Sequence, residues 1–450
     1  MNILIKHYEK FFKKLFETTP ELFVKSISLI TLVFIALSIL FARPFVGLFV
    51  FGFRLGELVI GTLMVLSFVI FFIPRNSIHK ELQIFLRLFK VIMLLFIVSL
   101  SLSNSSILNL YTYRTSSYIW TCLMFFVGYS IVAKYDYSYN LRYLLILIPI
   151  FTYLISSGNY PNVVIDFFNA YSDKFEFIKA SDLAIGLYIS TLIINKHIFS
   201  NVTAFNLTVL ITSIFIPLML FNSRGSFFSI LVFLFIYLFQ KRKLILNNKI
   251  NFLIIVILCI ISFLLSTFRV YGNFDFYKEP EAINSELVIE SIKGISNNKQ
   301  PAKVFLSFYI QDGYLMSWDP TTDWRLDIWQ DVYHDLVEKE RIIIGYGYKE
   351  IIPVMLDPTA PGRLGRDGLN ENVHNYFVNI LARGGILQLI MFLFLYIYLI
   401  RWYKSEHSDY KILILIIPIM ILSSLDVTME GVNFPIIFYT YLGYAMKKGI

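Results

Sequence analysis

Hydrophobic stretches long enough to cross a lipid bilayer recur along the whole chain. A transmembrane helix needs about 20 apolar residues. Since 57% of the residues are hydrophobic and only 16% are charged, a soluble globular class is excluded. The sequence predicts an all-α polytopic membrane protein of about twelve transmembrane helices. These are expected at 26–42, 54–74, 84–103, 117–133, 141–157, 180–199, 202–222, 225–240, 250–268, 382–401, 411–425 and 432–446.

The number of lysine and arginine residues alternates between high and low in successive connections between the predicted spans. With the N-terminus inside, the inner connections are richer in cations, as in the run Lys241, Arg242 and Lys243. The outer ones hold fewer, namely Arg43, Arg54, Arg114, Lys174, Lys179 and Arg224. Since cytoplasmic loops carry the excess of cations, both termini are expected in the cytoplasm. The net charge of +8 is therefore a topology signal, and no nucleic-acid partner is expected.

The same pattern divides the chain into four parts. Residues 1–25 resemble a basic amphipathic segment on the cytoplasmic surface, although a merely solvated N-terminus is the alternative. Residues 26–268 hold nine predicted spans, and 374–450 hold the last three. Between them, 269–373 form one large outer loop.

This loop has the composition of a folded cap. It contains 17 of the 31 carboxylates and three of the five tryptophans. Asp323 is placed to cap a helix whose apolar stripe runs through Leu326, Trp329 and Leu336. Because structureless loops of this length are uncommon in compact proteins, we expect a small helical domain with a function.

His374 is the first candidate for chemistry. It stands where the loop re-enters the membrane, and Asn375 follows it, with an amide that could hold a substrate or orient the ring. A neutral imidazole there is able to take a proton from an attacking hydroxyl. The alternative is a histidine that is hydrogen-bonded at a helix start.

Two arginines are expected on the same side as His374. Arg224 follows Ser223 in a very short outer turn, and its guanidinium suits two-point contact with a pyrophosphate. Arg325 lies near the start of the loop helix, where the helix dipole disfavours a cation unless an anion is close. The alternatives are a snorkelling Arg224 and an Arg325 paired with neighbouring aspartates.

Other ionisable residues give weaker signals. Glu430 and Asp426 lie in the last outer connection, where either could bind a sugar hydroxyl or remain solvated. Cys122 and Cys259 fall inside predicted spans, so neither a disulfide nor a metal site is expected. No nucleotide-binding motif is present, and therefore no cofactor is expected and the donor should be a lipid or a molecule already outside.

In this order, the motifs resemble those of the O-antigen ligase and O-antigen polymerase superfamily of bacterial envelope glycosyltransferases. The resemblance rests on Ser223-Arg224-Gly225, on Arg325 and Trp329 followed by Gly345-Tyr346-Gly347, and on His374-Asn375 followed by Gly385. The ligase pattern continues with Gly, Thr or Tyr three positions later, where this chain has Gln388. The choice between ligase and polymerase therefore stays open.

The resemblance implies a metal-independent, GT-C-type transfer of a glycan from undecaprenyl pyrophosphate. His374 would be the general base or would position the acceptor, while Arg224 and Arg325 would hold the pyrophosphate. Ser223, Asn375, Trp329 and Glu430 would support them. The acceptor would be a lipid A core sugar in a ligase and another lipid-linked glycan in a polymerase. The protein would lie in the bacterial inner membrane with the large loop in the periplasm.

The alternative from a different class of function is a transporter. A transporter or flippase for lipid-linked saccharides is expected to place charged groups near the middle of the membrane. In this chain the three candidate residues lie instead at one predicted surface, which favours the enzyme. No internal repeat of the kind found in many transporters is evident.

Overall fold

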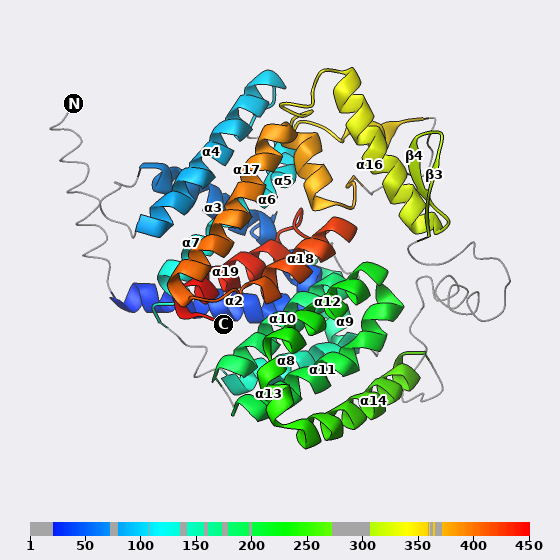
Figure 1. Ribbon diagram of the computed structural model, residues 1–450. Coiled ribbons are helices and arrows are strands. Elements are labelled where there is room, and N and C mark those ends of the chain that lie inside the picture. Colours follow the sequence, from blue (N-terminus) through cyan, green and yellow to red (C-terminus); the bar gives the residue numbers. More distant parts are fainter. Residues whose placement is uncertain are drawn as a thin grey trace.

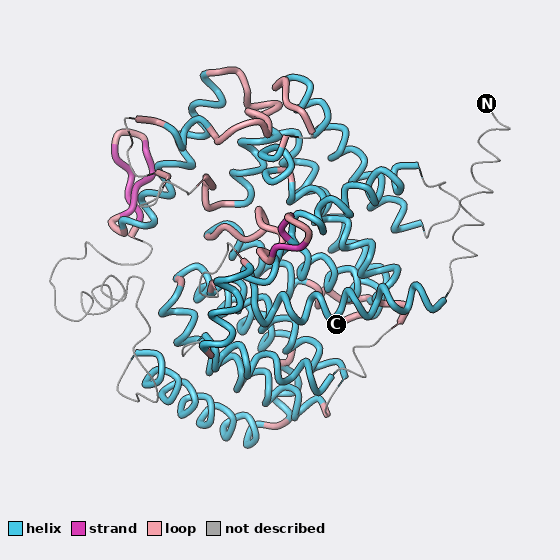
Figure 2. The backbone as a smooth tube through the Cα atoms, turned by 180° about the vertical axis from the view of Figure 1, so that it is seen from behind, coloured by secondary structure: helices cyan, strands magenta, loops and turns pink. Residues whose placement is uncertain are grey.

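The computed structural model describes residues 21–72, 80–107, 109–135, 142–156, 161–172, 179–197, 200–271, 307–358, 360, 363–364 and 371–450. The part described is almost entirely helical, with two short β-hairpins that lie apart from each other (Figures 1 and 2). Most of the predicted N-terminal segment 1–25, and loop residues 272–306, fall outside the described residues.

The first half of the chain forms helices joined by short connections. They are α2 (Glu21–Val46), α3 (Leu55–Phe72), α4 (Lys80–Leu102), α5 (Leu110–Thr115), α6 (Ser117–Trp120), η2 (Thr121–Leu123), α7 (Met124–Val127), η3 (Gly128–Val132), α8 (Arg142–Ser156), α9 (Asn162–Tyr171), α10 (Ala180–His197), α11 (Asn201–Asn222), α12 (Arg224–Gln240), α13 (Arg242–Asn247) and α14 (Lys249–Tyr271). The first hairpin, β1 (Phe49–Val50) and β2 (Phe53–Arg54), precedes α3. The apolar run before α3 is thus a tight hairpin.

The second half begins with the large loop. The remaining elements are β3 (Phe308–Gln311), β4 (Tyr314–Ser317), α16 (Pro320–Glu338), η4 (Pro353–Leu356), α17 (Tyr376–His407), α18 (Leu413–Leu425) and α19 (Asn433–Lys448). Helical structure therefore occupies all twelve stretches predicted as spans. The stretch 117–133 is a run of four short pieces, from α6 to η3.

Five described helices are long and apolar enough to cross a membrane. They are Val24–Val46, Lys80–Leu102, Asn201–Asn222, Lys249–Tyr271 and Tyr376–His407. In the most apolar window of Lys249–Tyr271 only 11% of the residues are buried, and α14 lies at the edge of the molecule (Figure 1). An apolar helix with so little protein around it suits contact with lipid. The chain is a multi-pass membrane protein, and the count of twelve spans stays a prediction.

The described part of the large loop is folded, as its composition predicts. Hairpin β3–β4 lies against α16 at one end of the molecule (Figure 1). A small hydrophobic core packs α16 against the segment that follows this helix and against α17. This core comprises Ile328, Val332, Leu336, Ile352, Val354, Met355, Val373 and Ala382.

The cap of α16 differs from the prediction. Asp319, rather than Asp323, accepts the backbone N–H of Thr322, and the helix begins at Pro320. Proline fixes φ for the first helical turn and has no N–H to leave unsatisfied, so the helix starts one turn earlier. Asp323 instead accepts the N–H of Ser317 and fastens β4 to the helix.

Helix α17 also begins earlier than predicted, at Tyr376, and it is interrupted at Gly385. Gly385 has φ +71°, and a Cβ there would clash with the carbonyl of Ile343. Opposite the interruption, Tyr346 N–H donates to Ala382 O at 2.7 Å and Ile386 N–H to Ile342 O at 2.8 Å. The loop is therefore bound to the kink of α17 by backbone hydrogen bonds, and this fixes the chain on both sides of His374.

Candidate active site

Arg224 is the first residue of α12. The Ser223 side chain caps this helix by accepting the N–H of Ser226 at 3.3 Å. The Arg224 guanidinium forms an ion pair with Asp319 of the loop, with Nη1 2.5 Å from Oδ1. Ser223 thus caps the start of α12, and Arg224 forms an ion pair with the loop.

Asp319 links two helix starts. Its carboxylate caps α16 through Thr322 and also contacts Arg224 at the start of α12. Burial opposes the charge, but the hydrogen bonds from Thr322 and Arg224 and the charge of Arg224 outweigh it, so the pKa of Asp319 is lowered. A charged Asp319 holds the loop over the first turn of α12.

Arg325 lies in the second turn of α16 and is half-buried. Burial lowers the pKa of its guanidinium, Asp426 and Asp319 oppose that effect, and the charge of Arg224 adds to it. Arg325 makes no ion pair with any residue that the structure describes, and its Nε has no hydrogen-bond partner there. The guanidinium is close to two carboxylates and is bound directly by neither.

His374 stands two residues before α17, in the left-handed region with φ 53°. Its ring packs edge-on against Trp324 of α16, with centroids 5.2 Å apart. Burial, followed by the charge of Arg325, lowers the pKa of His374 to about 4. The imidazole is therefore neutral at neutral pH, which a proton acceptor requires.

Trp329 and Asn375 fix the backbone around His374. The Trp329 indole N–H donates to Val373 O at 2.6 Å, which ties α16 to the residue before the histidine. Asn375 caps α17, since its side-chain oxygen accepts the N–H groups of Phe377 and Val378 at 2.9 and 3.1 Å. That oxygen serves the helix start, so Asn375 positions His374 through the backbone.

These contacts bring Arg224, Arg325 and His374 together from three elements. Two guanidinium groups near one neutral imidazole can stabilise negative charge while the imidazole accepts a proton. Among the described residues, no group of three His, Cys, Asp or Glu side chains could hold a metal ion. The arrangement suits group transfer with an anionic leaving group.

Glu430 belongs to a neighbouring cavity of about 350 Å³. Its Oε2 accepts the N–H of Thr428 at 3.0 Å, and burial raises the pKa of Glu430 to about 8. None of the three residues Arg224, Arg325 and His374 lines this cavity. Glu430 was predicted near them from the sequence, and it lies in the adjoining cavity.

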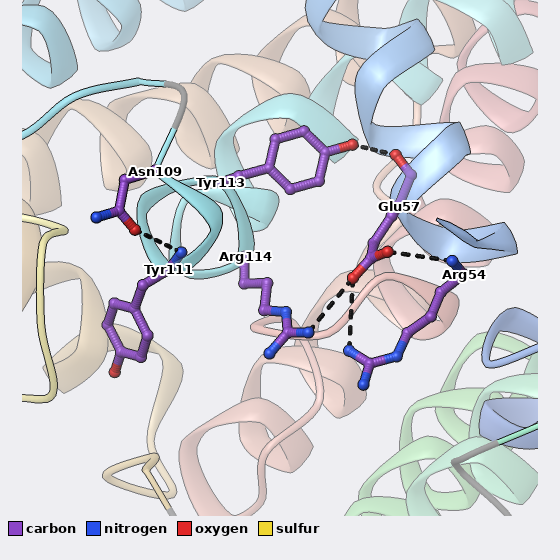
Figure 3. Close-up of polar contacts among 6 residues, drawn as sticks. All are labelled: Arg54, Glu57, Asn109, Tyr111, Tyr113 and Arg114. Carbon is purple, nitrogen blue, oxygen red and sulfur yellow. Dashed lines mark hydrogen bonds and ion pairs between the residues drawn. The ribbon is translucent and has the colours of Figure 1, made fainter. Parts of the chain in front are cut away.

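The lining of the cavity also includes a second group of arginines, two of which are drawn in Figure 3. Arg54 and Arg114 approach the same oxygen of Glu57 at 3.5 and 3.4 Å, and the Tyr113 hydroxyl donates to the backbone carbonyl of Glu57. One carboxylate oxygen is thus shared by two guanidinium groups. Arg43, held by Val427 O at 3.0 Å, also lines the cavity.

Sequence reasoning missed most of the cavity. Asp182, Asn379, Arg383 and Asn433 line it but come from helix ends far apart in the chain. One signal was available, because Arg43, Arg54 and Arg114 all lie in connections predicted on the same side as Arg224. Their gathering around one space required the tertiary structure.

A comparison with known families matches residues 207–393 of the chain to the family described as O-antigen ligase. The match includes Arg224, Arg325 and His374. The match covers less than half of the chain and supports the O-antigen ligase superfamily. Its members are glycosyltransferase-like ligases and polymerases of the membrane, and the matched segment contains α12, α16 and the kinked start of α17. No curated protein matches the sequence.

Proposed function

We propose that the protein is a glycosyltransferase at the periplasmic face of a bacterial inner membrane. It moves a glycan from undecaprenyl pyrophosphate to an acceptor hydroxyl, with a lipid A core sugar as the first acceptor to test. The observation that carries the proposal is the convergence of a neutral His374 with Arg224 and Arg325 at one end of the helices.

The reaction exchanges one C–O bond for another. The acceptor hydroxyl oxygen attacks the anomeric carbon of the donor and gives its proton to His374. The bond from that carbon to the pyrophosphate oxygen breaks, and its electron pair leaves with undecaprenyl pyrophosphate. Arg224 and Arg325 stabilise the charge that grows on this leaving group, so the transfer needs no metal.

Asp319 supports a role for the loop in assembling the site. Arg224 belongs to α12, whereas Arg325 belongs to the loop helix, and Asp319 connects the two elements. Donor pyrophosphate would compete with Asp319 for the Arg224 guanidinium. Loop closure over the donor is therefore a plausible gate for transfer.

The second candidate is a repeat-unit polymerase of the same superfamily, because the departure at Gln388 leaves the choice between ligase and polymerase open. Gln388 is fully buried, and its Oε1 accepts the hydroxyls of Tyr118 and Tyr348 at 2.8 and 2.6 Å. The departure thus concerns the packing of α17 against α6 and the loop. The acceptor must be decided by assay.

The test is a transfer assay with purified full-length protein and an undecaprenyl pyrophosphate-linked glycan in the presence of EDTA. Product on lipid A core, lost in His374→Ala and in Arg224→Ala, is the expected result. Removing a general base lowers the rate by roughly 10²–10⁴-fold. Chain extension with donor alone would make the protein a polymerase. Movement of saccharide across proteoliposomes without any transfer would replace the enzyme by a transporter.

A further inference from the structure

The cavity beside the candidate active site adjoins His374 along the chain. Glu371 and Asn372 line it just before the histidine, and Asn379 and Arg383 line it just after. The electrostatic surroundings also overlap, because Asp426 and Arg43 act on both His374 and Glu430. The cavity is thus a neighbouring compartment of the same site.

Three of the residues that line this cavity each carry a buried oxygen atom with no hydrogen-bond partner among the described residues. These atoms are Asp182 Oδ2, Asn433 Oδ1 and Glu430 Oε1. Asp182 is 4% exposed and Asn433 is 3% exposed, and the amide of Asn433 donates to the other oxygen of Asp182 at 3.3 Å. Asp182 Oδ2 and Asn433 Oδ1 are hydrogen-bond acceptors as placed. The raised pKa of Glu430 leaves its carboxyl group protonated at neutral pH, so Oε1 is able to donate a hydrogen bond as well.

A buried acceptor without a donor costs free energy, and a ligand that supplies donors recovers it. Sugar hydroxyl groups supply several donors at once, from different directions. The oxygens come from the first turn of α10, the start of α19 and the connection between α18 and α19. Such a spread around a cavity fits the edge of a sugar ring.

We propose that this cavity holds the acceptor sugar, and that Asp182, Asn433 and Glu430 form hydrogen bonds with its hydroxyl groups. The proposal rests on the proposed function, and it names a compartment for the second substrate. The sugar would place one hydroxyl toward His374, across the short segment from Asn372 to the histidine.

The unpaired oxygen atoms argue against the donor pyrophosphate as the occupant, because a pyrophosphate diester supplies no hydrogen-bond donor to them. Two carboxyl groups, Asp182 and Glu430, line the cavity beside Asn433, whose amide oxygen has no hydrogen-bond partner among the described residues. Of the arginines in the lining, Arg54 and Arg114 already share Glu57. Arg224 and Arg325, which lie outside the cavity, are better placed for a pyrophosphate, and the two substrates then occupy separate compartments.

The first experiment separates acceptor binding from donor binding in the full-length protein in nanodiscs. Asn433→Ala and Asp182→Asn each remove or alter one acceptor atom, and a lost hydrogen bond of this kind weakens binding by about tenfold. We expect the acceptor KM to rise by that factor while the donor KM is unchanged. The matched control is Asn251→Ala, because Asn251 and Asn206 satisfy each other away from the cavity.

Two kinetic results would overturn the inference while leaving the enzyme intact. One is an acceptor KM unchanged in both cavity variants. The other is a rise in donor KM equal to the rise for the acceptor. A folding defect is recognised separately, since it lowers the amount of active protein without changing either KM.

A labelling experiment keeps the inference testable even if no transfer is found. Asn433→Cys is made in a Cys259→Ser background, because Cys122 is fully buried and Cys259 is half-buried. The probes are a deacylated lipid A core oligosaccharide, the lipid-linked repeat unit and inorganic pyrophosphate. Protection of the new thiol from a small alkylating reagent by a saccharide is expected. Protection by pyrophosphate alone, or by none of the three, would reject the acceptor site.

Discussion

Two arginines, one that contacts helix α16 and one that is part of it, differ in the number of charged partners around them. Arg363 is 3% exposed, contacts the carboxylates of Asp327 and Asp331, and donates to Val354 O at 3.0 Å. Arg325, on the helix itself, makes no ion pair with a described residue although Asp319 and Asp426 are close enough to affect its pKa. One guanidinium is neutralised within the loop, and the other is not.

The difference distinguishes an arginine that stabilises the loop from one that is available to bind an anionic ligand. Two carboxylates and a carbonyl around Arg363 satisfy the cation and join α16 to the segment after it. A half-buried cation without such partners is costly unless an anion arrives. We therefore expect Arg363 to stabilise the loop and Arg325 to bind the donor as proposed above, and each expectation is open to a direct test.

Replacing Arg325 should give the largest difference between the two. Arg325→Gln removes positive charge where the leaving pyrophosphate is expected, so kcat should fall by roughly 10²–10³-fold. Thermal unfolding should change little, because no described partner loses an ion pair. The assay is transfer in nanodiscs, with Arg363→Gln as the matched control. Equal loss of kcat in both variants, at equal stability, would erase the distinction.

Arg363→Gln should act on stability instead. Losing the hydrogen bonds to two carboxylates should destabilise the loop by about 2 kcal/mol, or roughly 30-fold in its opening equilibrium. This figure is at the lower end for a buried arginine, because Asp327 is 54% and Asp331 32% exposed and water can replace the cation. Hydrogen exchange of the α16 amides would report the change. Unaltered exchange would show that Arg363 does not hold the loop.

The sequence was informative wherever the structure depends on local pattern. Helices occupy every stretch predicted from hydrophobic length, and the apolar stripe of 326–336 does form the loop helix. The start of that helix was misplaced because Pro320 favours Asp319 as the cap over Asp323. A shift of one turn matters here, since it makes Asp319 the partner of Arg224.

The candidate site was only partly predictable, for a physical reason. Arg224, Arg325 and His374 were marked by charge or titratable character at membrane edges, which is a local signal. Asp182 and Asn433 bind each other across 251 positions of the chain, and either alone looks like an ordinary polar residue at a helix end. Only packing shows that they share a cavity.

The pH dependence of transfer would sharpen the role of Arg325 through His374. Burial and the charge of Arg325 lower the pKa of His374 to about 4, so the base stays neutral until the pH falls to that value. We expect kcat/KM to be flat from pH 7 to 5.5, where an ordinary histidine of pKa near 6.5 would lose about tenfold. In Arg325→Gln the residual activity should decline at a higher pH. A decline near pH 6.5 in the unmodified protein would contradict the assigned environment.

Asp319→Asn should have the smallest effect, and its sign is informative. Asparagine caps a helix about as well as aspartate, so the free energy of unfolding should change by less than about 1 kcal/mol. The substitution removes the negative charge that now pairs with Arg224, and a pyrophosphate would no longer compete with it. Donor KM should therefore fall by roughly two- to fivefold, as expected for one partly exposed charge pair.

The control is Asp323→Asn, which alters the neighbouring carboxylate that holds β4 and leaves Arg224 paired. A rise in donor KM in Asp319→Asn alone would mean that Asp319 positions Arg224 for the donor. Arg224 would then depend on a carboxylate partner, as Arg363 does and Arg325 does not.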